Sequence, residues 1–410
     1  MHLIFRNPQF RLFWVAGAFG DVSMIAYFTV HGWLALQVTD SPFWVGATAG
    51  VGGIAMTVLA PWGGVLVDRF PKVNVVRTGS TLRGSLAIAL TVLVFTDSVA
   101  LWHVLAFSVT QGAAAAMRVP GMKTLSMDIA GVENLLAASA ARMTSMTVVG
   151  VVVPLSIGPV VDAVGIGWAY AAIAAGDLTS VALMSLLRPP QAAGTSERPS
   201  TFEALKSGIG YSLRHPLVRT ILGVMVLTEM FGWSVEPILP VVVRDVLGGG
   251  ATGLGMLFAA ASGGAAISAL VLSSVRVVPH KGWLMVVGIV GFGCFLFCFA
   301  LSRSMPLSLV LFMLAGASTS LYETAADTVL QSGVDRMMRG RVLSFQAMLW
   351  GVSGMSGFHV GAIANFFGAP VAIGIGGVVV TLAGIGLSKF AGKLDRPARF
   401  RAAPTAETQG

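Results

Sequence analysis

The sequence predicts an all-α membrane protein of twelve transmembrane helices, arranged as two six-helix bundles. Of its 410 residues, 55% are hydrophobic and only 11% are charged, whereas a soluble domain carries about 25% charged residues. Apolar runs of about twenty residues, the length that crosses a bilayer, recur along the whole chain. These runs lack the alternation of barrel strands, and only helices or closed barrels satisfy their backbone groups in hydrocarbon.

Short polar breaks separate the twelve expected spanning helices. The first six cover residues 10–37, 42–67, 73–95, 100–117, 135–161 and 167–187. The other six cover residues 217–243, 253–275, 282–302, 305–330, 342–367 and 370–388.

The longest break, between the sixth and seventh runs, divides the chain six plus six. Residues 188–200 have the composition of a flexible linker. Residues 201–214 place apolar side chains at helical spacing, which predicts an amphipathic helix on the membrane surface. The expected domains are a bundle at 1–187, a linker at 188–216, a bundle at 217–390 and a tail at 391–410.

The distribution of basic residues predicts the orientation, because positively charged loops stay in the cytoplasm. With the N-terminus inside, only Arg244 and Arg303 of the 26 Lys and Arg residues fall on the outer side. We therefore expect a multi-pass protein of the cytoplasmic membrane with both termini cytoplasmic. The same asymmetry explains the net charge of +8 without a nucleic-acid partner.

Several other function classes are not expected from the sequence. Cys294 and Cys298 are too few for a disulfide framework, and no secretory signal segment begins the chain. The chain has no His-Glu-x-x-His motif, no Gly-x-Ser-x-Gly elbow and no phosphate-cradling loop. We therefore expect no enzyme activity, no metal, no cofactor and no direct use of ATP.

Acidic residues within the expected spans are the main candidates for a functional site, because a charge in hydrocarbon is costly. Burial disfavours the charged form of an unpaired carboxylate, which can then carry protons. Proton or substrate binding is therefore expected at Asp21, Glu229, Glu236, Glu323 and Asp327. Asp177 is as readily explained by a hydrogen bond between helices, and Arg83 and Arg142 are expected to snorkel to the interface.

Asp21, Met24, Phe28 and His31 share one helical face, since residues three or four apart are neighbours on a helix. Carboxylate, thioether and aromatic groups together suit an amphipathic or cationic ligand. Met24 and Phe28 are therefore candidate binding residues. The alternative explanation for either side chain is packing between helices.

The loop after the second span carries a recognisable pattern. Gly64-Val-Leu-Val-Asp68-Arg69-Phe-Pro71-Lys72, followed by Arg77, resembles the signature loop between helices two and three of the major facilitator superfamily. The resemblance implies a cytoplasmic gate formed by Gly64, Asp68, Arg69, Arg77 and Arg341, in which Asp68 pairs with Arg77. Pro71 stands where the family usually has glycine.

Further segments resemble the macrolide-efflux and enterobactin-exporter branch of that superfamily, among them Gly20-Asp21, Gly158-Pro159, Leu239-Pro240 and Arg339-Gly-Arg341. The resemblance implies a central cavity lined mainly by helices one, four, seven and ten, with Gln111 of helix four among its residues. Two departures concern proton coupling. Ser108 replaces the usual arginine of helix four, and Asp162 follows Gly158-Pro159 where a glycine pair is usual.

These features together predict a monomeric secondary transporter that exports an amphipathic drug or siderophore-like molecule in exchange for protons, as in multidrug antiport. Its expected partners are the small-molecule substrate, protons and membrane lipid. Two alternatives remain open. One is transport of a lysolipid or another native metabolite, and the other is a membrane receptor or scaffold that binds a ligand without moving it.

Overall fold

The computed structural model describes residues 4–188, 210, 214–274, 280–333 and 336–394, without the side chains of 132, 217, 331–348, 350 and 393. Within these residues the chain is helical and contains no strand. The first half contains α1 (Pro8–Thr39), α2 (Pro42–Arg69), α3 (Lys72–Phe95), α4 (Leu101–Ala130), α5 (Leu135–Val164) and α6 (Ile166–Ser185). The second half contains α8 (Pro216–Leu227), η3 (Thr228–Gly232), α9 (Val235–Val241), η4 (Val242–Val246), α10 (Ala251–Ser274), α11 (Lys281–Leu301), α12 (Met305–Gly333), α13 (Arg336–Phe367) and α14 (Ala369–Leu394).

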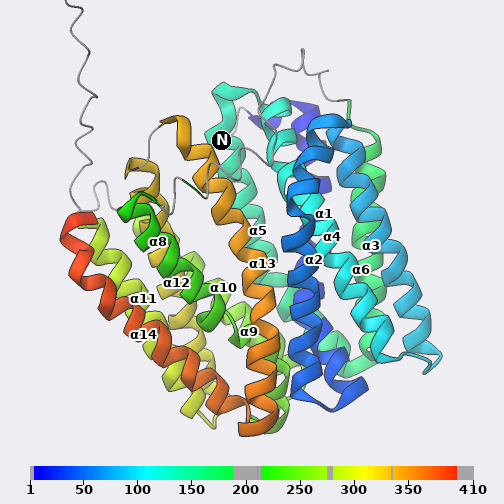
Figure 1. The fold of residues 1–410 in the computed structure, drawn as a ribbon. Helices are drawn as coiled ribbons and strands as arrows, with labels where there is room; N and C mark the ends of the chain where they lie inside the picture. The colour runs from blue at the N-terminus through cyan, green and yellow to red at the C-terminus, as the bar shows by residue number, and fades with distance from the viewer. Residues whose placement is uncertain (1–3, 189–209, 211–213, 275–279, 334–335, 395–410) are drawn as a thin grey trace, which may run out of the picture.

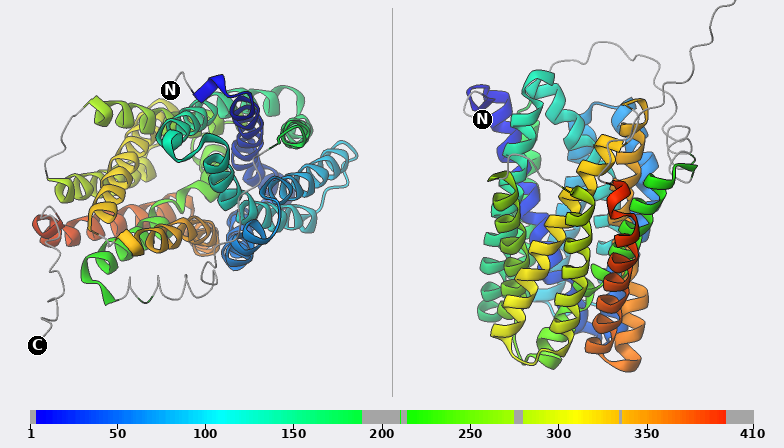
Figure 2. Two further views of the ribbon diagram at one scale, coloured as in Figure 1. Left: turned by 90° about the horizontal axis from the view of Figure 1, so that it is seen from above. Right: turned by 90° about the vertical axis from the view of Figure 1, so that its left-hand side faces the viewer.

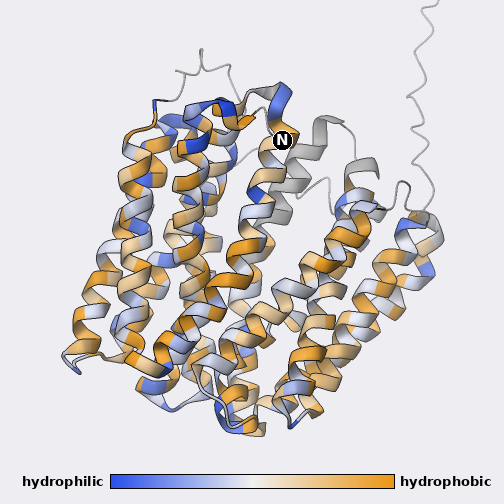
Figure 3. Ribbon diagram, turned by 180° about the vertical axis from the view of Figure 1, so that it is seen from behind, coloured by the Kyte–Doolittle hydropathy of each residue, from blue (hydrophilic) through white to orange (hydrophobic). Residues whose placement is uncertain are grey.

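Ten of these helices are long and apolar enough to cross a membrane, with Val218–Val246 counted as one. The two long helices outside that set are α4 of the first half and α13 of the second half, which have 30 and 32 residues. Polar residues gather toward the two ends of the helices, and the middle is largely apolar (Figure 3). The fold is the predicted pair of six-helix bundles.

The helices begin and end where local chemistry favours it. Asn7 caps α1, since its Oδ1 accepts a hydrogen bond from the backbone N–H of Gln9 at 2.9 Å. Pro8 and Pro42 occupy the first positions of α1 and α2, where the missing N–H has no consequence. The end of the bundle that carries the start of α1 is called the terminal face below, and the end that carries Asp40 the distal face (Figure 1).

Two predicted spans differ from the observed helices. The fourth was expected to end at residue 117, but α4 continues to Ala130 and includes Arg118 and Pro120. The seventh was expected to be a regular helix, but two π-helical turns, η3 and η4, interrupt it. The amphipathic helix predicted at 201–214 lies outside the described residues apart from its positions 210 and 214.

The two halves meet along two helix pairs, α2 with α13 and α5 with α10, as the view onto the terminal face shows (Figure 2). Glycines make these contacts close. A Cβ added at Gly46 of α2 would clash with the carbonyl oxygen of Gly357 in α13. A Cβ added at Gly158 of α5 would lie 2.9 Å from the Cα of Thr252 in α10. Both helix pairs therefore approach most closely at glycines.

Candidate functional site

Glu229 is the most buried of the candidate acids in the second half, with 6% of its surface exposed. It lies in the π-helical turn η3. A π turn adds one residue to a helical turn and often marks a functional site, because it redirects the side chains that follow. Gly232 closes this turn against the ring of Phe292, where a larger residue would clash.

Three other candidate acids lie on helices of the same half as Glu229. Glu236 lies one helical segment further along, in α9, while Glu323 and Asp327 lie on α12. Glu229 interacts electrostatically with Glu323 and Glu236, and Glu323 does so with Asp327. Among the described residues no ion pair joins Glu229, Glu236 or Glu323 to a basic side chain. These four residues are called the acidic cluster below.

Asp21 differs from the acidic cluster because it is paired. Its Oδ1 accepts a hydrogen bond from Arg118 of α4 at 2.9 Å and lies 3.5 Å from the guanidinium of Arg142 of α5. The Asp21 side chain is 1% exposed. The expectation of an unpaired Asp21 carboxylate is therefore wrong, and so is the expectation that Arg142 snorkels away from the helices. The physical reason is the extension of α4, which brings Arg118 into the bundle.

Arg83 and Asp177 form a second buried ion pair, between α3 and α6. The guanidinium Nε donates to Asp177 Oδ2 at 2.7 Å, and a second nitrogen donates to Asp177 Oδ1. The same guanidinium donates to the side-chain oxygen of Gln111 at 3.1 Å. Arg83 therefore does not snorkel, as its 1% exposure also shows. Gln111, predicted as a substrate or proton ligand, is 4% exposed and helps hold Arg83.

His31 and Ser108 belong to a polar network inside the first half. The His31 Nε2 lies 2.8 Å from the Ser108 hydroxyl, and its Nδ1 lies 2.8 Å from the hydroxyl of Tyr170. Both ring nitrogens thus have buried partners, which fixes the orientation of the ring. Of the aromatic and sulfur face predicted on α1, Phe28 is 52% exposed and Met24 is partly buried.

The predicted gate lies at the terminal face. Asp68 and Arg69 are exposed at the end of α2, Gly64 is partly buried, and Arg77 is partly buried in α3. Next to them, the Lys72 ammonium lies 2.5 Å from the Asp128 carboxylate and joins α3 to the end of α4. The backbone of Arg341 belongs to α13, but its side chain lies outside the described residues. The pairing of Asp68 with Arg77 stays a prediction.

The distal face joins the two halves by polar contacts. The Arg244 guanidinium lies 2.7 Å from the Asp40 carboxylate, between η4 and the end of α1. The Ser41 hydroxyl donates to the side-chain oxygen of Asn365 at 3.3 Å. Asp162 also contributes, since its carboxylate accepts hydrogen bonds from the first backbone N–H groups of α10. These contacts connect the halves at the end opposite the predicted gate.

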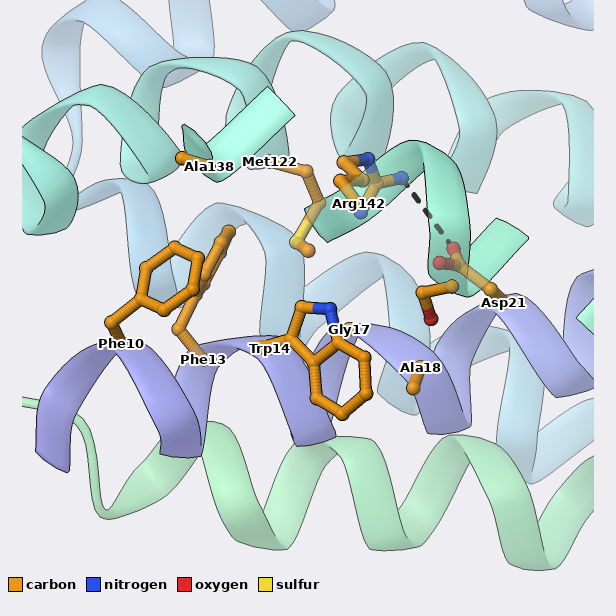
Figure 4. A pocket seen from close by; sticks show the side chains of 10 residues that line it. Phe10, Phe13, Trp14, Gly17, Ala18, Asp21, Met122, Ala138 and Arg142 are labelled. Atoms are coloured by element: carbon orange, nitrogen blue, oxygen red, sulfur yellow. Dashed lines mark hydrogen bonds and ion pairs between the residues drawn. The ribbon is translucent and has the colours of Figure 1, made fainter. Parts of the chain in front are cut away.

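A small pocket lies between α1, α4 and α5 (Figure 4). It reaches Asp21 and Arg142 at one end and has aromatic walls at the other. Its lining residues are Phe10, Phe13, Trp14, Gly17, Ala18, Asp21, Met122, Ala138, Arg142 and Ser145. Among the described residues no group of His, Cys, Asp and Glu is arranged to hold a metal ion.

A family model described as transmembrane secretion effector matches residues 3–396. The chain belongs to this family of the major facilitator superfamily. The enterobactin exporter EntS of Salmonella typhimurium is 26% identical over 416 residues, which cover 100% of this chain and 98% of the exporter. EntS of Escherichia coli is 27% identical over 365 residues, which cover 88% of this chain and 85% of the exporter.

Solved transporter structures share the fold of this secretion effector family member. A peptide transporter of the POT family superposes with a TM-score of 0.75 at 12% identity, over 94% of this chain and 95% of that chain. A bacterial homologue of the human lysosomal transporter Spinster, inward-facing and unoccupied, superposes with a TM-score of 0.72 at 14% identity, over 95% of this chain and 96% of that chain. The protein is therefore a multi-pass membrane transporter of the major facilitator fold.

The two departures of this secretion effector from the superfamily pattern have structural counterparts. Ser108 replaces the usual arginine, but the interior of the first half still carries positive charge. Arg83 of α3 and Arg118 of α4 are both buried there. Asp162 uses its carboxylate to hold the start of α10. Sequence reasoning missed Arg118 as a site residue because the fourth span was expected to stop one residue before it. The one available signal was a buried acid, Asp21, without an assigned partner.

Proposed function

We propose that this transporter exports an amphipathic molecule of the drug or siderophore-like kind by alternating access, driven by protons moving inward. The family description and the enterobactin exporters among its relatives support export. The proposed location is the cytoplasmic membrane, with the terminal face in the cytoplasm. Of the 26 Lys and Arg residues, all but Arg244 and Arg303 belong to that side, which supports this orientation.

The arrangement of contacts between the halves supports alternating access. The glycine contacts run from Gly46 to Gly53 in α2 and from Gly150 to Gly158 in α5. These stretches lie in the distal parts of the two helices, where the polar contacts of Asp40 and Asp162 are also found. A molecule would enter the central site from the terminal face and leave when these distal contacts break and the halves rock. Asp68, Arg69, Arg77 and Arg341 would then close the terminal face.

The observation that carries proton coupling is the acidic cluster, in which the buried Glu229 interacts electrostatically with Glu323 and Glu236. Carboxylates so placed repel one another when all are charged, so at least one favours the protonated form. A ligand or a change of conformation that separates them would release the proton. Each proton that moves inward yields about 2.3 kcal/mol per 100 mV of membrane potential. Asp21, held by two arginines, is a weaker candidate for this role than Glu229.

The test uses the purified protein in proteoliposomes with a panel of labelled amphipathic compounds, siderophores and lysolipids included. Saturable counterflow identifies a transported compound without any gradient. An imposed pH gradient should then drive its accumulation. Glu229→Gln should abolish the gradient-driven accumulation and leave counterflow measurable, whereas the matched change Asp21→Asn should leave some gradient-driven transport.

Three other results would change this proposal. Binding without counterflow across the whole panel would favour a receptor or scaffold. Counterflow of lysolipids alone would favour the native-lipid alternative. Gradient-driven transport that survives both Glu229→Gln and Glu323→Gln would remove the acidic cluster from the coupling mechanism.

A further inference from the structure

We propose that His359 of α13 is a positioning residue for Glu229: it holds the π-helical turn η3 in the shape that places the Glu229 carboxylate within the acidic cluster. The proposal rests on the proposed function and deepens it, because it names a second helix through which proton coupling is controlled. His359 does not belong to the acidic cluster and would act only through Glu229.

His359 contacts the π turn at the two residues directly after Glu229. Its imidazole donates a hydrogen bond to the backbone carbonyl of Met230. Its ring centroid lies 5.3 Å from that of Phe231. His359 is partly buried, and a hydrogen bond is stronger where water is partly excluded. One side chain of α13 thus contacts both residues that follow Glu229 in η3.

The π turn needs such contacts because its backbone hydrogen bonds depart from the α-helical pattern. The N–H of Trp233 donates to the carbonyl of Thr228, five residues back, at 3.1 Å, and Trp233 and Ser234 then separate η3 from α9. The carbonyl of Phe231 accepts a hydrogen bond from the Ser234 hydroxyl at 2.7 Å. Since a buried backbone carbonyl is costly without a partner, a side-chain donor such as His359 stabilises this turn.

Neighbouring helices fix the other sides of the turn. The Ser353 hydroxyl of α13 hydrogen-bonds with the Glu229 carboxylate. A Cβ added at Gly376 of α14 would clash with the carbonyl oxygen of Phe231, and Gly232 lies as closely against α11. The turn is therefore wedged between α11, α13 and α14. The position of the Glu229 carboxylate depends on how α13 lies against η3.

The same stretch of α13 forms part of the contact between the two halves. Gly357, two residues before His359, packs against Gly46 of α2 in the first half. A shift of α13 along α2 as the halves rock would change the contact between His359 and the π turn. The conformation of the transporter would then control where the Glu229 carboxylate lies.

Two substitutions of similar size separate hydrogen bonding from packing. His359→Gln keeps an N–H donor, whereas His359→Met fills the space without one. Amide hydrogen exchange of the purified full-length protein, followed by mass spectrometry, needs no substrate and no gradient. Exchange in peptides that cover 228–236 should rise about fivefold in His359→Met, the effect of losing one hydrogen bond. It should stay near the wild-type rate in His359→Gln.

The functional readout is the proteoliposome assay. His359→Met should lower gradient-driven accumulation severalfold and leave counterflow measurable, the result also expected for Glu229→Gln, and His359→Gln should restore accumulation. A residue that only supports packing would lower both activities together. In the Glu229→Gln background, His359→Met should cause no further loss, because His359 acts through Glu229.

The matched control is His103→Met in α4 of the first half, where the imidazole accepts a hydrogen bond from the backbone N–H of Ala100 at 2.9 Å. It should change neither the exchange at 228–236 nor the coupling. His359→Leu, which also lacks a donor, replaces His359→Met if that variant does not fold.

Wild-type exchange in a folded His359→Met protein would overturn the proposal, as would an equal rise in His359→Gln. Undiminished gradient-driven transport in His359→Met, where Glu229→Gln abolishes it, would also overturn it. Gradient-driven transport that survives Glu229→Gln would instead count against the proposed function. In that case the exchange measurement still decides whether His359 holds the turn.

Discussion

Asp162 of α5 caps the first turn of α10 in the other half of the molecule: its Oδ1 accepts a hydrogen bond from the backbone N–H of Ala251 at 2.9 Å. Its Oδ2 accepts a second one from the N–H of Thr252 at 2.8 Å. The first N–H groups of a helix have no partner within the helix and carry partial positive charge. One carboxylate of the first half therefore stabilises the second half, but only while the distal face is closed.

Asp162→Ala should loosen the distal face. Loss of a capping side chain costs about 1 kcal/mol, which shifts an equilibrium between closed and open distal faces by about fivefold. Spin labels at the exposed positions Ser98 and Ser304, one in each half, report the separation by pulsed electron resonance. Both native cysteines are first replaced by serine. A longer distance should appear in Asp162→Ala but not in Glu133→Ala, which removes an exposed acid outside the distal face.

Asp40→Asn should have a smaller effect than Asp162→Ala. The Asp40 side chain is 81% exposed and its partner Arg244 also binds Asp245, at 2.6 Å. Exposed ion pairs contribute about 0–1 kcal/mol and weaken with salt. The same spin-label pair should show a slight opening at low salt that disappears at high salt. An Asp40→Asn effect as large as that of Asp162→Ala would mean that the ion pair dominates the closure.

Gly46→Ala should force α2 and α13 apart, because the added methyl group would meet the carbonyl oxygen of Gly357. The matched control is Gly263→Ala in α10, where no atom lies within 4 Å of the added Cβ. There the exchange should be neutral or stabilise the helix by up to about 1 kcal/mol. Thermal unfolding in detergent should show a lower midpoint for Gly46→Ala only. Equal unfolding midpoints would mean that α2 and α13 can move apart at this position without loss of stability.

Arg83→Met and Asp177→Leu should each destabilise the protein strongly, by about 3–5 kcal/mol, because each leaves a buried charge without its partner. The double variant should lose much less stability than the two single variants lose together, because it leaves neither buried charge. Equilibrium unfolding of the four proteins gives the coupling energy. A coupling near zero would show that the two side chains are not paired in the membrane.

The prediction of twelve spans succeeded because hydrophobicity is a local property. A run such as 282–302 reports its own burial in lipid, and the observed helix, Lys281–Leu301, differs by one residue at each end. The same reasoning failed at α4, where the predicted end at 117 was placed before a charged residue. The charge of Arg118 is buried within the bundle because Asp21 neutralises it from another helix, and no window along the sequence includes that partner.

The sequence by itself determined the helical fold, the division into two halves and the presence of acids inside the spans. Only the tertiary structure decided which acids are paired. Asp21 lies 97 residues from Arg118, and Asp177 lies 94 residues from Arg83. The length of an apolar run depends only on the contact of that one helix with lipid. Whether a buried charge has a partner depends instead on which other helix packs beside it. Glu229, Glu236 and Glu323 interact electrostatically with one another and form no ion pair with a basic side chain among the described residues, and this makes them the stronger candidates for proton transfer.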